Sequence, residues 1–401
     1  MDTNDLPIMK KLTKLPLLAK VGIAVVLGVG FSFFTPLPIT RIFETFNGLF
    51  SNFLNFIIPV MIVGLVAPGI TEIGKGAGKM LGATAGIAYF STICAGLFAY
   101  AACILTYPHV LDFSSSAGGL GSAFTSQVDV EPYFTVDMPP VFGVMSALIL
   151  SFILGLTLTF VQGDTLRKGL VELRDLVMLV ISKVIIPLLP LYIFGIFLKM
   201  GTEGVVMSVI GLFLKVIVVI FIIHILLLVI QFVIAGAIAG KNPFKSLKTM
   251  LPAYFTALGT QSSAATIPVT LAQAKRNGVR AEVADFVIPL CATIHLAGST
   301  LKIVACAIAI SLMCGAPHDL GLYFEFIMML GITMVAAPGV PGGAIMAALG
   351  IISSILGFDT QMQELMIALY IAMDSFGTAC NVTGDGAIAM VVDRLFSKNF
   401  K

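Results

Sequence analysis

Charged side chains are scarce in this chain. Asp, Glu, Lys and Arg make up 11% of its 401 residues, whereas hydrophobic residues make up 58%, and the net charge is only +2. Soluble globular proteins contain roughly 25% charged and about 45–50% apolar residues. The mean hydropathy of +1.05 agrees with this imbalance. The composition argues against a cytosolic enzyme, a nucleic-acid-binding protein and a disordered regulator, and it predicts many membrane spans.

Redox motifs are also lacking. The chain has six cysteines but no Cys-x-x-Cys pair. Every cysteine lies in or beside an apolar stretch, where a thiol packs as a small hydrophobic side chain. We therefore expect the cysteines to have packing roles, and we predict no cofactor.

Eight apolar stretches reach the length of about 20 residues that a membrane-spanning helix needs. They are 17–36, 46–70, 81–106, 141–162, 175–200, 204–240, 282–314 and 361–394. The first stretch follows three lysines and contains a fourth near its start, as in a signal peptide, but it lacks a small-residue cleavage site. We therefore expect it to be retained as the first helix.

Two further apolar segments, 243–275 and 322–357, are interrupted by Ser, Gly and Pro. If the N-terminus is cytoplasmic and both segments return to the side where they began, 18 of the 23 Lys and Arg residues lie in cytoplasmic loops. The stretch 107–140, which has no Lys or Arg, then lies outside. This agrees with the positive-inside rule, which a full crossing of either segment would violate. We therefore predict two re-entrant hairpins and cytoplasmic N- and C-termini.

The unit of hairpin plus helix occurs twice, and the two copies open toward opposite sides of the membrane. Non-helical backbone at membrane depth is tolerated only where protein buries it or where it lines an aqueous cavity. Paired interrupted segments of opposite orientation are typical of inverted repeats, which place a binding site near the midplane and support alternating access.

Four polar residues of the last apolar stretch, Asp374, Thr378, Asn381 and Asp385, are spaced by 4, 3 and 4 residues. This spacing places them on one face of a helix. An ionisable group at this depth costs at least about 2.5–3.5 kcal/mol, so such groups usually line the path of an ion or a substrate. A purely structural polar seam between helices is the alternative.

A second polar stripe, His295, Ser299 and Lys302, follows the same helical spacing in the preceding span. Lys302 could neutralise an aspartate, stand in for a bound cation, attract an anionic substrate or form a structural pair. His295 could carry a proton or serve only as a hydrogen-bonding group.

Together these residues resemble the dicarboxylate/amino acid:cation symporter family, which includes glutamate transporters and bacterial neutral amino-acid transporters. The similarity spans roughly 80–396 and is most specific in the motif Ser262–Pro268, in the tip Gly339–Gly342, and in Asp374 with Asn381–Asp385. The resemblance implies an all-α polytopic membrane protein with eight transmembrane helices and two re-entrant hairpins, a homotrimer in which a transport domain moves like an elevator against a scaffold.

The resemblance also implies a division of the chain into domains. The first scaffold helices would cover 1–80, the third helix, 81–106, would belong to the transport domain, and 107–240 would hold an outer loop and scaffold helices four to six. The transport domain would continue over 241–396. The sixth helix is left open between the two domains.

The resemblance further implies roles for single residues. The substrate-binding residues would be Ser262, Ser263, Ser299, Gly339, Val340, Asp374, Gly377, Thr378 and Asn381. The sodium ligands would be Asp385, Asn381, Cys291 and Thr293, with His295 and Lys302 as coupling or charge residues.

Two departures from the family pattern affect the expected substrate and ions. Carriers of acidic amino acids have an arginine where this chain has Gly377, and arginine is suited to bidentate pairing with a carboxylate. We therefore favour a small neutral amino acid, with dicarboxylates or acidic amino acids read by Lys302 as the alternative. The family's Asn and Asp are replaced by His295 and Ala297, which predicts the loss of one sodium site and coupling to sodium or protons.

Two other classes were weighed against a symporter. An aspartyl protease needs two carboxylates about 3 Å apart, whereas positions 374 and 385 of one helix are separated by about 16 Å. The chain is therefore predicted not to be an enzyme. An ion channel is a more distant alternative, because paired inverted hairpins favour alternating access over an open pore. We place the protein in the cell's inner (plasma) membrane, with a small-molecule substrate, a coupling cation and the lipid bilayer as partners and no nucleic acid.

Overall fold

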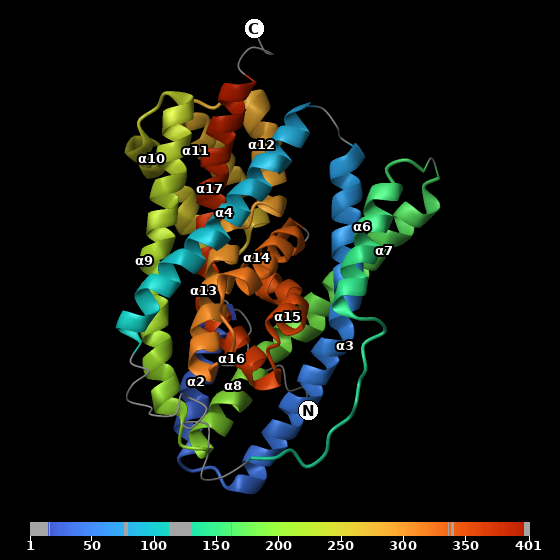
Figure 1. Cartoon of the computed structure of the whole chain (residues 1–401), viewed down its shortest axis with the longest axis vertical. Helices are drawn as coiled ribbons and strands as arrows, with labels where there is room; N and C mark the ends of the chain where they lie inside the picture. The colour runs from blue at the N-terminus through green and yellow to red at the C-terminus, as the bar shows by residue number, and fades with distance from the viewer. Residues whose placement is uncertain are drawn as a thin grey trace, which may run out of the picture.

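The structure is a computed structural model that describes residues 15, 17–75, 79–111, 130–161, 163–335, 337 and 341–396. Most of these residues lie in helices, and none of those described forms a strand (Figure 1). The predicted all-α class is thereby confirmed.

The first half of the chain contains the longest helices. They are α2 (Leu17–Ser32), α3 (Leu37–Lys75), α4 (Lys79–Val110), α6 (Val144–Thr157), α7 (Thr165–Val180), the π-turn η1 (Ile181–Ile185), α8 (Ile186–Thr202) and α9 (Val206–Ala239). Within the described ranges, five helices are long and apolar enough to cross a membrane: Leu37–Pro68, Lys79–Val110, Thr165–Thr202, Val206–Ala239 and Ala281–Cys314. All eight predicted spans fall on helices, although α2 and α6 are shorter than a full span.

The second half is built from helices in broken pairs. They are α10 (Pro243–Thr260), α11 (Ser263–Arg276), α12 (Ala281–Ile294), α13 (Ala297–Cys314), α14 (Leu320–Val335), α15 (Gly343–Leu356), α16 (Thr360–Ile371) and α17 (Asp374–Leu395). The pair α16–α17 is apolar enough to form a sixth span, bent by 61° at its break.

Both interrupted segments fold as helix–turn–helix hairpins, as predicted. The first turns at Gln261, whose φ of 54° is left-handed, and Ser262 then caps α11 by accepting a hydrogen bond from the Ala265 amide (3.3 Å). A serine at this position satisfies one of the unpaired amides of the first helical turn. In the second hairpin, Gly342 adopts a φ of 74° directly before α15, a conformation that glycine tolerates better than other residues.

The helices form two packed groups. Helix α2 packs on α8, and α3 packs on α6, α7 and α8, whereas α17 is surrounded by α9, α10, α12 and α13. Helix α14 contacts α4 of the second group, and α15 contacts α3 and α6 of the first, so this hairpin lies between the groups (Figure 1). The predicted division into scaffold and transport domains stays a prediction, but α9 packs with the second group.

Burial separates peripheral spans from central ones. The most apolar window of α9 is 39% buried, whereas that of α12–α13 is 94% buried. Exposed apolar side chains on α9 suit contact with lipid, because the bilayer core contains no water. Polar residues on α13 and α17 therefore lie inside the protein, where they must find partners.

Candidate substrate and cation site

The second group contains two broken spans, and their breaks lie at opposite ends of the contact between α13 and α17, one near Asp385 and one near Lys302. The span α12–α13 is interrupted at His295 and Leu296, which leave helical geometry with ψ values of 97° and 42°. The span α16–α17 is interrupted at Ala372 and Met373. Because α13 packs on both α16 and α17, the two predicted polar stripes face each other. Breaks of this kind free backbone groups and bring side chains from different turns together.

Asn381 joins the two stripes. Its Oδ1 accepts hydrogen bonds from the amides of Gly298 (2.8 Å) and Ser299 (3.2 Å), and its Nδ2 donates to the Ser299 hydroxyl (3.0 Å). These amides belong to the first turn of α13, which has no intrahelical partners for them. The side chain of Asn381, which is 2% exposed, thus caps α13 and fixes it against α17.

Gly298 makes this close approach possible. A Cβ atom at this position would lie 2.8 Å from the carbonyl oxygen of Gly377 and 3.0 Å from Sγ of Cys380. Any larger residue would push α13 away from α17, because both obstacles sit in packed structure.

The first charged pair consists of Lys302 and Asp374. The Lys302 ammonium donates hydrogen bonds to the carbonyls of Met373 (3.0 Å) and Asp374 (3.3 Å), and it lies 3.7 Å from Oδ1 of Asp374. It also sits 4.1 Å from the ring centroid of Tyr370, a favourable cation–π contact. Lys302 is 0% exposed, so its ammonium is shielded from solvent.

Asp374 also holds the tip of the second hairpin. Its Oδ2 accepts a hydrogen bond of 2.6 Å from the backbone amide of Gly342, at the start of α15. Both oxygens of this carboxylate are therefore engaged, one by the hairpin and one by Lys302. A ligand of either oxygen would therefore have to displace the Gly342 amide or the Lys302 ammonium.

Gly377 is where the Lys302 side chain reaches α17. A Cβ atom at position 377 would overlap Cε and Nζ of Lys302. The ammonium of Lys302 therefore occupies the space in which a side chain of residue 377 would begin. The absence of an arginine at 377, which favoured a neutral substrate, thus does not leave this place without a positive charge.

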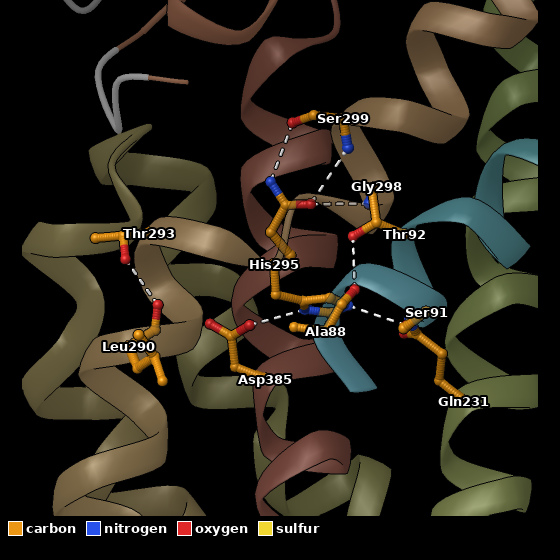
Figure 2. A network of polar contacts seen from close by, with 11 residues as sticks. Ala88, Ser91, Thr92, Gln231, Leu290, Thr293, His295, Gly298, Ser299 and Asp385 are labelled. Atoms are coloured by element: carbon orange, nitrogen blue, oxygen red, sulfur yellow. Dashed lines mark hydrogen bonds and ion pairs between the residues drawn. The ribbon is translucent and has the colours of Figure 1, made fainter. Parts of the chain in front are cut away.

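The second pair consists of His295 and Asp385. Nδ1 of His295 lies 2.9 Å from Oδ1 of Asp385, and Nε2 lies 3.1 Å from the Ser91 hydroxyl (Figure 2). Gln231 of α9 donates from Nε2 to the same hydroxyl (3.2 Å). His295 and Asp385 are 0% and 1% exposed. Gly384 leaves room for this chain, since a Cβ there would lie 2.9 Å from Cε1 of His295.

The residues predicted to bind sodium make different contacts. The Thr293 side chain is exposed and donates to the Leu290 carbonyl (2.7 Å), away from Asp385 (Figure 2). The Cys291 carbonyl accepts the His295 amide (2.9 Å), and the Asn381 side chain caps α13. Of the predicted set, only Asp385 has a side-chain oxygen that is buried and without a hydrogen-bond partner in the described structure, namely Oδ2.

The structure describes some of the remaining residues that were predicted to bind substrate. Ser263 is buried at the start of α11, next to Ser262, and the Thr378 hydroxyl donates to the Asp374 carbonyl (3.3 Å). Gly339 and Val340 lie outside the described residues.

Ser91, Gln231 and the Gly342 amide are not among the residues predicted from the sequence. Gln231 gave a signal, because it is the single side-chain amide in a long apolar helix, where a polar group needs a partner. The Gly342 contact has no signal in the sequence, since it is made by backbone.

Interrupted helices that face each other, two hairpins and buried charges at their meeting point define a polytopic membrane transport protein. The chain belongs to the sodium:dicarboxylate symporter family, whose model matches residues 17–395. This confirms the resemblance to the glutamate-transporter fold, and it confirms that the protein is not an enzyme, because the family is one of transporters.

Individual relatives carry the names of amino acid transporters. Excitatory amino acid transporter 2 of Homo sapiens is 33% identical over 194 residues, which are 48% of this chain and 33% of the relative. Excitatory amino acid transporter 5 of Mus musculus is 30% identical over 164 residues, or 41% of this chain and 29% of the relative. Excitatory amino acid transporter 1 of Homo sapiens is 33% identical over 169 residues, or 41% and 30%. The matched region of this chain thus spans about a third of the length of these relatives.

Proposed function

We propose that the protein is a cation-coupled symporter of small anionic substrates, with dicarboxylates as the first class and acidic amino acids as the second. The observation that carries the proposal is the position of the Lys302 ammonium in the space beside Gly377. The family's description names sodium and dicarboxylates, and the relatives are named as carriers of excitatory amino acids. Both support an anionic substrate over the neutral amino acid favoured from the sequence.

The charge balance of the site favours an anion. Lys302 is fully buried, and its nearest carboxylate oxygen, Oδ1 of Asp374, lies at 3.7 Å, which is longer than a hydrogen bond. A buried charge is strongly stabilised by a well-placed second partner, because the interior screens the attraction little. A substrate carboxylate that reaches the space beside Gly377 would be such a partner.

The state of Asp374 distinguishes the two classes of anion. The family resemblance implies that this carboxylate holds a substrate ammonium, but here it faces Lys302 and the Gly342 amide. A dicarboxylate has no ammonium and leaves this arrangement intact. An acidic amino acid would have to share Asp374 with Lys302, which makes it the weaker substrate on electrostatic grounds. Its place as second candidate rests on the names of the relatives.

The mode of transport is proposed from the resemblance and from the packing. The group containing α17 would move as an elevator against the group containing α3, within a homotrimer in the plasma membrane, with both termini cytoplasmic. Sodium is the first candidate for the coupling cation, because the family description names it.

Uptake into proteoliposomes tests the proposal. Purified protein would be given radiolabelled succinate, aspartate, glutamate, serine and alanine, with a sodium gradient or a proton gradient imposed separately. We expect accumulation of succinate above that of aspartate under the sodium gradient, and little accumulation of serine. Accumulation of serine or alanine alone would refute an anionic substrate, and equilibration without accumulation would indicate a channel.

A further inference from the structure

Asp385 poses a separate question, because it is a carboxylate buried at membrane depth in a family named for sodium. Such a group needs a positive partner or several hydrogen-bond donors. Sodium, like other hard cations, is bound by a shell of oxygen ligands. The structure places the imidazole of His295 beside this carboxylate.

The hydrogen-bond chain fixes the orientation of this imidazole. The Gln231 amide donates to the Ser91 oxygen, so the Ser91 hydroxyl can donate to Nε2 of His295. The hydrogen of the neutral ring is then on Nδ1, from which it is donated to Oδ1 of Asp385. If the Gln231 amide is turned over, the Ser91 hydroxyl donates to it and accepts from Nε2 instead. In that arrangement Nδ1 of His295 still donates to Asp385 when the ring is an imidazolium, with hydrogens on both nitrogens.

The imidazole ring also occupies space in which oxygen ligands of a sodium ion would have to lie. Cε1 of His295 lies 2.9 Å from the point at which Gly384 would carry a Cβ atom, so the imidazole is packed directly against α17. Nearby hydroxyls are turned away, since Thr92 donates to the Ala88 carbonyl (2.9 Å) and Thr293 to that of Leu290 (2.7 Å) (Figure 2). Oδ2 of Asp385 and Oε1 of Gln231 have no hydrogen-bond partner in the described structure, but these side chains lie at opposite ends of the chain of contacts through Ser91 and His295.

We infer that the imidazole of His295, oriented by Ser91 and Gln231, takes the place beside Asp385 that a sodium ion would otherwise hold. Asp385 then keeps the same partner, a side chain of the protein itself, through the transport cycle. This position adds no sodium ion to the coupling stoichiometry. Ser91 and Gln231 act as positioning residues through His295. The inference rests on the proposed symport, but it concerns which ions bind and not which substrate is carried.

Sodium binding to the purified protein tests this directly, and the test needs no substrate. A ligand that binds only the folded state raises the melting temperature as its concentration rises. Melting would be followed from 1 to 200 mM sodium chloride, with choline chloride holding the ionic strength constant, in the wild type and in Asp385→Asn. We expect the same sodium-dependent shift in both proteins. A shift present in the wild type and lost in Asp385→Asn would overturn the inference, because it would show that sodium uses this carboxylate.

The complementary variant is His295→Asn, alone and with Ala297→Asp, which exchanges the imidazole for oxygen ligands. We expect the sodium-dependent shift to increase over that of the wild type, and the Hill coefficient for sodium in uptake to rise by about one. His318→Asn, at an exposed histidine outside this chain of contacts, is the matched control and should leave both quantities unchanged. Well-folded variants with an unchanged sodium response would also overturn the inference. Loss of uptake with the melting results intact would refute only the proposed symport.

Discussion

The two carboxylates of α17 differ in how their partners hold them. Asp374 faces a flexible lysine at 3.7 Å and the amide of a hairpin tip at 2.6 Å, whereas Asp385 faces a rigid imidazole at 2.9 Å that is itself held by Ser91. The first pair lies next to an element that contacts both helix groups, and the second lies wholly within one group. The comparison indicates that Asp374 can exchange one of its partners for a substrate, whereas Asp385 keeps its partner.

The same comparison explains why two buried carboxylates on one helix need not share a function. Removing one member of a buried pair leaves an uncompensated charge, which costs about 3–5 kcal/mol. A site that must bind and release an ion or substrate therefore needs a replacement partner at each step. Asp374 has the Gly342 amide as a second contact, but Oδ2 of Asp385 has no hydrogen-bond partner in the described structure.

The largest effect is expected from Gly377→Arg. Because a Cβ atom at 377 already overlaps the Lys302 side chain, arginine would expel the ammonium from its pocket and bring two like charges together. We expect uptake of every substrate to fall below detection while the protein still reaches the membrane. Efficient uptake of aspartate by this single variant would contradict the position of Lys302.

Lys302→Met should have the next largest effect. Methionine keeps the length of the side chain but removes the charge, so Asp374 would lose its buried partner and the site its attraction for an anion. By the cost of about 3–5 kcal/mol for an unpaired buried charge, we expect succinate uptake to fall by more than about 100-fold. Initial rates for succinate and serine measure this. An equal and small loss for both substrates would point to a structural role for Lys302.

Gly298→Ala tests whether the close contact of α13 with α17 positions both pairs. The added methyl group would meet the Gly377 carbonyl and Cys380, and such overpacking costs about 1–3 kcal/mol. We expect a lower melting temperature and weaker uptake, with the preference between succinate and serine unchanged. Gly211→Ala, where no atom lies within 4 Å of the added methyl group, is the control. A normal melting temperature would show that the helices can separate without cost.

The smallest effect is expected from Ser91→Ala. This change removes one hydrogen bond to Nε2 of His295 but leaves the contact with Asp385, so the loss of stability should be about 1 kcal/mol. Thermal melting measures the loss, and succinate uptake should stay within about twofold of the wild type. A large change in substrate preference would mean that the second pair is coupled to the first.

Hydropathy and charge distribution predicted most of the fold. The eight apolar stretches and both hairpins were recognisable because a bilayer imposes span length and confines breaks to buried places. The uneven distribution of Lys and Arg then predicted which loops lie on the cytoplasmic side. The exact helix ends were less predictable, as in α3, which begins at Leu37 instead of residue 46.

The site was predicted by residue but not by pairing. Helical spacing identified the stripes on α13 and α17, yet it did not show that the Lys302 ammonium would lie at Gly377 or that His295 would face Asp385. Both contacts depend on the packing angle of two helices and on glycines that permit close approach, which are tertiary properties. Because the contact of Lys302 with Gly377 could not be predicted, the neutral substrate was inferred from position 377 alone.

The most direct test of the account is the double variant Lys302→Ala/Gly377→Arg, which moves the positive charge from α13 to α17 while vacating the space that an arginine needs. The measurement is the ratio of the initial rates of succinate and serine uptake in proteoliposomes, compared with Lys302→Ala alone. The account predicts that Lys302→Ala loses the preference for succinate and that the double variant recovers it at least tenfold. A preference for succinate that survives in Lys302→Ala, without any charge at this place, would contradict the account.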